Sequence, residues 1–158
     1  MRLFSKAAEV RPDDYEAPAL LGTCFNGLGR MDEKLAVAQK SIRVIEKHLE
    51  LHPDDARAVY FGAGRWSVVG DREKALEWCR RALKMAPGQS GVRYNVACVY
   101  VGEGLLEEAL DLLEQNVAER WGNRAWFEND PDMKPLQDHP RFRAILDKMP
   151  VRRAGESG

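Results

Sequence analysis

The stretch Gly70-Asp71-Arg72-Glu73-Lys74-Ala75-Leu76 decides the fold, because its pattern occurs three times in the chain. Equivalent stretches begin at Gly29 (GRMDEKL) and Gly104 (GLLEEAL), so successive glycines stand 41 and 34 residues apart. A glycine in this context ends a helix in the left-handed conformation, and the acidic residues that follow favour the first turn of the next helix. The three stretches therefore predict three helix–turn–helix units.

A second kind of boundary separates these units. Pro12, Pro53 and Pro87 each follow an apolar-periodic segment and precede residues that cap helices, namely aspartates or Gln89-Ser90. Between the boundaries the apolar residues keep a helical period, and no window alternates as a strand does. We therefore expect an all-α chain, with principal helices near 2–11, 14–28, 32–51, 55–69, 72–85, 90–102 and 105–119.

The units resemble tetratricopeptide repeats (TPRs), whose first helix carries W-x₂-L-G-x₂-Y and whose second carries A-x₃-F before a proline. The resemblance covers roughly residues 15–121 and rests on three matches in register. The matching residues are Pro18, Leu21, Gly22 and Phe25; Val59, Gly62, Ala63 and Trp66; and Arg93, Val96, Ala97 and Tyr100. It implies a TPR-like α-solenoid, a right-handed superhelix of antiparallel helix hairpins that binds proteins.

The first unit departs from the pattern, because Lys34 replaces a small alanine and the unit is about two helical turns too long. The excess lies in 32–51, where one apolar stripe predicts a core face: Leu35, Ala38, Ile42, Ile45 and Leu49. A second line, Val37, Val44 and Leu51, widens that face. This line either packs on neighbouring helices or is exposed for a partner or a second copy of the chain.

The pattern divides residues 1–149 into one domain. Its parts are a half repeat (2–11), a long repeat (15–55), two regular repeats (56–89 and 90–121) and a C-terminal cap (122–149), followed by a disordered tail (150–158). The half repeat lacks its hairpin mate, so we expect either a fragment of a longer protein or a docked N-terminal cap. If Leu3, Phe4 and Ala7 are exposed there, this terminal helix is a candidate homodimer contact. In the cap, helices are expected near Asn123–Phe127 and after Pro140.

The segment 93–149 is similar to the C-terminal repeat regions of large bacterial signalling proteins, in which repeats follow a cyclase, a kinase or a DNA-binding domain. This similarity implies a regulatory or scaffolding role, as the protein-binding part of a larger chain.

Composition narrows the classes of partner. The 24 basic and 25 acidic side chains give a net charge of −1, which disfavours nucleic acid and anionic membranes as partners. No apolar stretch is long enough for a membrane span, and the N-terminus lacks a signal-peptide core. Cys24, Cys79 and Cys98 form no C-x-x-C motif, so we expect reduced thiols in a cytoplasmic protein. The alternative function is RNA binding by helical repeats, which needs a basic concave face.

The first helices of stacked hairpins line the concave face, so their i, i+4, i+7 positions form the candidate protein-binding groove. These residues are Thr23, Asn26, Tyr60, Gly64, Ser67, Tyr94, Asn95, Cys98 and Val101. Tyr60 and Tyr94 are either amphipathic anchors for a partner or packing residues between repeats. Only Asn95 and Arg57 suit a clamp for a peptide carboxylate, so that specialised site is disfavoured.

The sequence offers no catalytic, metal or cofactor site. His48 and His52 are four residues apart on one helix with Glu50 between them, but no third metal ligand is evident. Gly62 and Gly64 lie within a helix and follow no strand, so they do not form a phosphate loop. The predicted function is a non-catalytic interaction module.

Overall fold

The computed structural model describes residues 15, 25 and 28–150. This part of the chain is helical and contains no strand. Its elements are α3 (Met31–Leu51), α4 (Ala56–Val68), α5 (Arg72–Met85), α6 (Ser90–Gly102), α7 (Leu106–Ala118), α8 (Arg124–Asn129), the 3₁₀ helix η1 (Pro131–Leu136) and α9 (Pro140–Asp147). The helix predicted at 2–11, most of the one at 14–28 and the tail beyond residue 150 lie outside the described residues.

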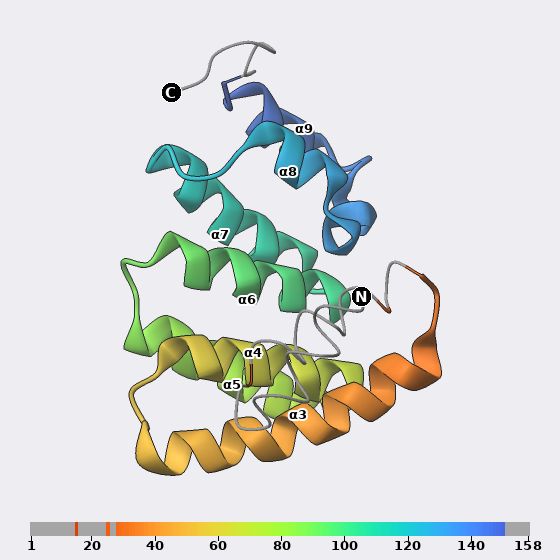
Figure 1. Cartoon of the computed structure of the whole chain (residues 1–158). Coiled ribbons are helices and arrows are strands. Elements are labelled where there is room, and N and C mark those ends of the chain that lie inside the picture. The colour runs from red at the N-terminus through yellow and green to blue at the C-terminus, as the bar shows by residue number, and fades with distance from the viewer. Residues whose placement is uncertain (1–14, 16–24, 26–27, 151–158) are drawn as a thin grey trace, which may run out of the picture.

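The helices stack one hairpin after another along the molecule (Figure 1). α4 packs against both α3 and α5, α6 packs against α7, and α6 also joins the two halves by contacting α4 and α5. α8, η1 and α9 lie at the far end, where η1 contacts α6 and α9 contacts α7. The predicted fold class is confirmed: in its described residues the chain is an all-α, TPR-like solenoid of antiparallel helix hairpins with capping helices.

Glycine follows α4 and α6, the first helices of the two hairpins that the structure describes in full, as predicted. Gly29, Gly70 and Gly104 have φ values of +67°, +85° and +77°, a region that residues with a Cβ rarely adopt. The proline boundary is also confirmed where Asp55 caps α4, since its carboxylate accepts hydrogen bonds from the backbone N–H groups of Arg57 and Ala58. These local signals place the helix ends and so fix the register of the stack.

Two clusters of buried side chains form the core. The first joins α3, α4, α5 and α6 around Ile45, Val59 and Cys79. The second joins α6 and α7 to the cap around Leu110 and Phe127. Tyr100 and Leu112 pack against both clusters, so the apolar interior is continuous from the long repeat to the cap.

The apolar stripe on α3 is buried except at its first member. Ala38, Ile42, Ile45 and Leu49 are buried, but 39% of Leu35 is exposed, so the prediction of a core position was wrong for that residue. α3 has 21 residues and its partner α4 has 13, so the first turns of α3 extend past α4 (Figure 1). Of the second line, Leu51 is 77% exposed, whereas Val44 is half-buried against the first core cluster.

Candidate protein-binding groove

A groove of about 190 Å³ lies where α4 and α6 run side by side. Two further elements reach it, because α3 contributes Lys34 and η1 contributes Asp132. The lining residues are Lys34, Tyr60, Phe61, Gly64, Arg65, Ser67, Val68, Asn95, Cys98, Val99, Gly102 and Asp132. The site is therefore assembled from α3, α4, α6 and η1.

The structure brings together five of the groove residues predicted from the sequence. Tyr60, Gly64 and Ser67 lie on α4, and Asn95 and Cys98 face them from α6. Thr23 and Asn26 lie outside the described residues. These five residues share one groove because equivalent positions on successive first helices lie on one face, and their role in binding stays a prediction.

Tyr94 and Val101 are placed differently, inside the second core cluster. Only 2% of Tyr94 and 4% of Val101 is exposed. The ring of Tyr94 packs 4.6 Å from that of Trp126, and its hydroxyl donates a hydrogen bond of 2.5 Å to Asp130. Tyr94 therefore packs in the core between α6 and the cap and not in the groove, because α8 and η1 cover that end of α6.

Hydrogen bonds hold the polar side chains along the two helices. The Ser67 hydroxyl donates to Glu103 (2.5 Å), which also lies 3.4 Å from the Arg72 guanidinium. The Asn95 side-chain amide donates to the carbonyl of Gly91 one turn earlier (2.8 Å). These contacts fix the groove walls before any partner arrives.

Sequence reasoning missed the charged residues of the groove, Lys34, Arg65 and Asp132. Burial raises the pKa of Asp132, and the neighbouring carboxylate of Asp130 raises it further, while Lys34 and Arg65 oppose this rise. Burial lowers the pKa of both Lys34 and Arg65. Asp132 is exposed as a residue, but enough protein surrounds its carboxylate to change its titration. The groove therefore combines charges of both signs.

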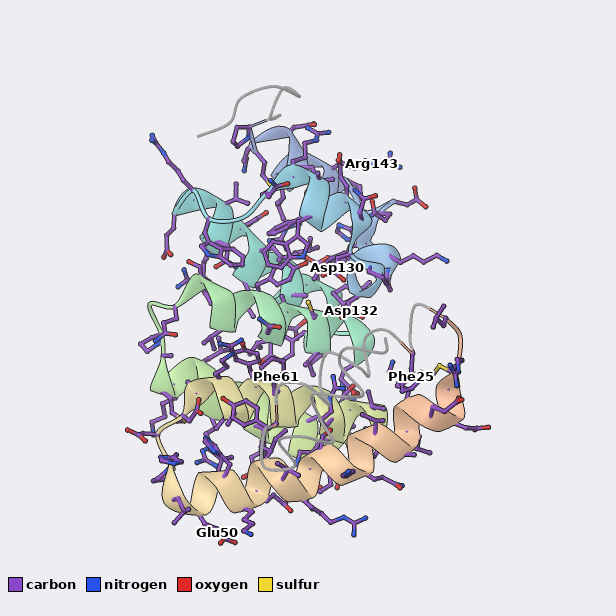
Figure 2. The ribbon with its side chains drawn as sticks, viewed as in Figure 1. Phe25, Glu50, Phe61, Asp130, Asp132 and Arg143 are labelled. Carbon is purple, nitrogen blue, oxygen red and sulfur yellow. The ribbon has the colours of Figure 1, made fainter. Side chains whose placement is uncertain are left out.

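Asp132 reaches the groove because a capped turn positions it. Asp130 precedes η1, and one of its carboxylate oxygens accepts from the Asp132 backbone N–H (2.9 Å) while the other accepts from Tyr94. Figure 2 shows Asp130 and Asp132 close together beside α6, with Phe61 below them on α4. The sequence N-D-P-D at 129–132 predicts this turn, but not which helix the turn packs against.

The described cysteine and histidine side chains are either unreactive or not grouped into one site. Burial raises the pKa of the Cys79 thiol to about 12 and that of the Cys98 thiol well above its ordinary value, so both favour the unreactive thiol form. His48 contacts Asp55 (2.9 Å) and stacks near His52, with ring centroids 4.7 Å apart. Among the described residues, no three metal-ligating side chains gather into one site. Likewise, none of the described helices is long and apolar enough to cross a membrane.

Comparisons with known proteins point to helical repeats. No family model matches the chain. It is 25% identical over 146 residues to mouse interferon-induced protein with tetratricopeptide repeats 3, covering 92% of this chain and 33% of that protein. It is 36% identical over 63 residues to the Arabidopsis thaliana protein CTR9 homolog, covering 40% of this chain and 6% of that protein. The chain thus spans a third or less of the length of these relatives.

The solved structure of MamA has the same fold. The two chains superpose with a TM-score of 0.52 at 19% sequence identity, over 93% of this chain and 85% of MamA. In fold, this chain is similar to TPR-type repeat proteins. A relative named for tetratricopeptide repeats and a matching solenoid agree with the three sequence repeats on that point.

Proposed function

We propose that this chain is a non-catalytic module that binds a segment of another protein in the groove between α4 and α6. One observation carries the proposal: side chains from successive repeats and from the cap converge on a single preformed groove. TPR-like solenoids use such concave surfaces to bind proteins.

The size of the groove supports a protein partner rather than a metabolite. Pockets for small molecules commonly have volumes of roughly 300–1,000 Å³. At about 190 Å³, this groove is smaller, and it suits one side chain of a partner whose other residues lie on the surrounding surface. Tyr60 lines the groove and is half-buried, so its ring provides an apolar surface for a partner.

Within this function, the chain serves as a regulatory or scaffolding part of a larger bacterial signalling protein in the cytoplasm. The similarity of residues 93–149 to the repeat regions of such proteins supports this context. A second contact, between two copies of the chain, would use Leu51 at the exposed end of α3, or the helix expected at 2–11, which lies outside the described residues.

Affinity capture with groove variants tests the proposal. The immobilised chain is expected to capture a protein from a bacterial lysate, and Tyr60→Ala is expected to weaken that capture by at least ~1 kcal/mol, about fivefold in affinity, while the fold survives. Glu77→Ala, an exposed position on α5, is the matched control and is expected to bind like wild type. Equal capture by wild type and Tyr60→Ala would contradict the groove as the site. Nuclease-sensitive capture would favour RNA binding instead.

A further inference from the structure

Two glycines in the groove are not explained by the fold. Gly64 lies within α4 and Gly102 ends α6, and neither has a positive φ. Among the described residues, a Cβ on Gly64 would meet only Val99 Cγ2, and one on Gly102 only Ser67 Oγ, each at an ordinary 3.9 Å. A glycine inside a helix costs about 0.5–1 kcal/mol relative to alanine, and packing against the described residues does not require this glycine at position 64.

Gly62, one half-turn earlier on α4, shows the contrast. A Cβ there would lie 2.1 Å from Cζ3 of Trp78, so the packing of α4 on α5 requires glycine. None of the described residues comes so close to Gly64, which lines the groove instead. Because glycine has no side chain, only backbone atoms of residue 64 line the groove, and we call this surface its floor.

The space above this floor matches one aromatic ring. An apolar cavity of roughly 150 Å³ in a protein holds benzene. The groove, at about 190 Å³, has room for a ring with one additional oxygen atom. Phe61, Val68 and Val99 supply apolar walls. An aromatic side chain therefore fits both the volume and the walls.

The polar end of the groove favours a neutral tip that donates a hydrogen bond. Lys34, Arg65 and Asp132 interact with one another through their charges. Because this end of the groove contains both positive and negative charges, it attracts neither a cationic nor an anionic side chain selectively. Within the described part of the chain, the Asp132 carboxylate accepts no hydrogen bond and forms no ion pair within 4 Å. Lys34 and Arg65, in contrast, each interact with another group as well. A phenol suits this end because it donates while remaining uncharged.

The same molecule contains this pairing twice. The hydroxyl of Tyr94 donates to Asp130 at 2.5 Å, and that of Tyr15 donates to Asp55 at 2.9 Å. Asp132 lies two residues from Asp130 on the same turn. We propose, building on the function above, that the groove receives a tyrosine side chain of the partner, with its ring over Gly64 and Gly102 and its hydroxyl donating to Asp132.

Short peptides test the chemistry of this site directly. The full chain, labelled with ¹⁵N, is titrated with acetylated, amidated pentapeptides that carry tyrosine, phenylalanine, arginine or glutamate between two alanines on each side. The tyrosine peptide is expected to shift the amide signals of Gly64 and Gly102 and to bind at least fivefold more tightly than the phenylalanine peptide, because a hydrogen bond to a carboxylate is gained. Asp132→Ala should abolish that preference.

Gly64→Ala separates a binding role from a structural one. The variant is expected to melt about 2–4 °C higher than wild type, because alanine favours the helix. It should nevertheless bind the tyrosine peptide at least threefold more weakly, since the methyl group occupies the floor. Gly91→Ala is the control, because Gly91 is also a helical glycine with open space around it but does not line the groove. It should gain stability without losing affinity.

Several outcomes would overturn the inference. These are tighter binding of the arginine or glutamate peptide, no preference for tyrosine over phenylalanine, no detectable binding of the tyrosine peptide, or unchanged affinity in Gly64→Ala. If Tyr60→Ala still loses the captured protein in any of these cases, the groove remains a protein-binding site and only its proposed preference for tyrosine fails.

Discussion

At the scale of single residues, Arg93 shows how this chain departs from the repeat pattern. It stands where the TPR pattern has tryptophan, and it is only 4% exposed. Its guanidinium donates to the Asn116 side chain (2.8 Å), the Pro87 carbonyl (2.9 Å) and the Ser90 hydroxyl (2.9 Å), and it also contacts Glu119. The buried positive charge of Arg93 is tolerated because these oxygen atoms accept its hydrogen bonds.

Arg93→Ala is expected to destabilise the chain by about 2–4 kcal/mol, because it leaves the buried Asn116 side chain and the Pro87 carbonyl without their donor. Urea denaturation followed by circular dichroism measures the loss. Arg143→Ala is the control, because Arg143 bonds only at the surface, to Asp138 and to the Gln137 carbonyl, and should leave the midpoint unchanged. A similar midpoint for both variants would mean that the buried network contributes little.

The sequence pattern agrees with the observed burial of small residues in the repeats. Ala63, Ala75, Ala97 and Ala109 are fully buried, as small residues at helix crossings should be. It could not predict the partners of Arg93, because Asn116 lies on another helix and its distance from Arg93 depends on how α6 and α7 cross. The same reason hides Asp132, whose place in the groove depends on the packing of η1 against α6.

At the scale of elements, the sequence predicted where helices begin and end more accurately than it predicted which of their side chains are exposed. The predicted spans 72–85 and 90–102 match α5 and α6, because a capping residue or proline marks each boundary. Leu35 was assigned to the core because its helical period is correct. Its exposure depends on the length of α4 relative to α3, which periodicity along α3 does not report.

Gly62→Ala should disrupt the α4–α5 contact. Its Cβ would lie 2.1 and 2.4 Å from two ring atoms of Trp78, so the indole or one helix must move. We expect a loss of roughly 1–3 kcal/mol by thermal or urea denaturation, despite the better helix propensity of alanine. Gly64→Ala, one half-turn away, is expected to change stability in the opposite direction. A gain of stability in Gly62→Ala would show that Trp78 can move aside without cost, which would contradict this expectation.

Asp55 joins three parts of the chain, and this makes its contribution dependent on pH. Burial alone would raise its pKa, but hydrogen bonds from the Ala58 N–H, His48 and Tyr15 outweigh it and lower the pKa below the ordinary value. A carboxylate with a lowered pKa stabilises the fold above its unfolded pKa, about 4, and that stability is lost as the pH falls through the folded value.

Asp55→Asn keeps an N-cap but removes this titration. Wild type is expected to be more stable than the variant by about 1 kcal/mol at pH 5, because bonds to a charged acceptor are stronger. The difference should shrink as the pH is lowered towards 2, in urea titrations at each pH. A difference that stays constant between pH 5 and pH 2 would show that the Asp55 charge does not contribute.

At the scale of the whole molecule, α6 is the helix that connects the two core clusters, the groove and the cap. It contributes to both core clusters, it forms one wall of the groove, and η1 packs against it from the cap. The groove therefore lies where the repeats meet the cap, and it is incomplete without Asp132 from η1. In a solenoid each unit contacts only its neighbours, so the last unit decides whether the preceding apolar face is covered.

Removal of the cap should expose that face. A chain that ends at Arg120 lacks Phe127, Met133, Phe142 and Ile145, which are buried against α6 and α7 in the second core cluster. Tyr94, Ala97 and Leu113 would then border solvent. We expect a lower melting temperature and, at about 50 µM, a dimer in sedimentation velocity runs, because a large exposed apolar patch tends to associate. The full chain under the same conditions supplies the reference.

Adding a synthetic peptide of residues 121–149 separates loss of cover from general unfolding. If the cap acts by covering α6 and α7, the peptide should dissociate the dimer and raise the melting temperature of the truncated chain, since anything that binds the folded state stabilises it by mass action. It should also restore binding of the tyrosine pentapeptide, because the peptide carries Asp132 back to the groove. A cap peptide with Asp132→Ala should restore the monomer but not the preference for tyrosine. A truncated chain that stays monomeric and melts like the full chain would show that the cap covers nothing essential, and the cap would then be an independent element.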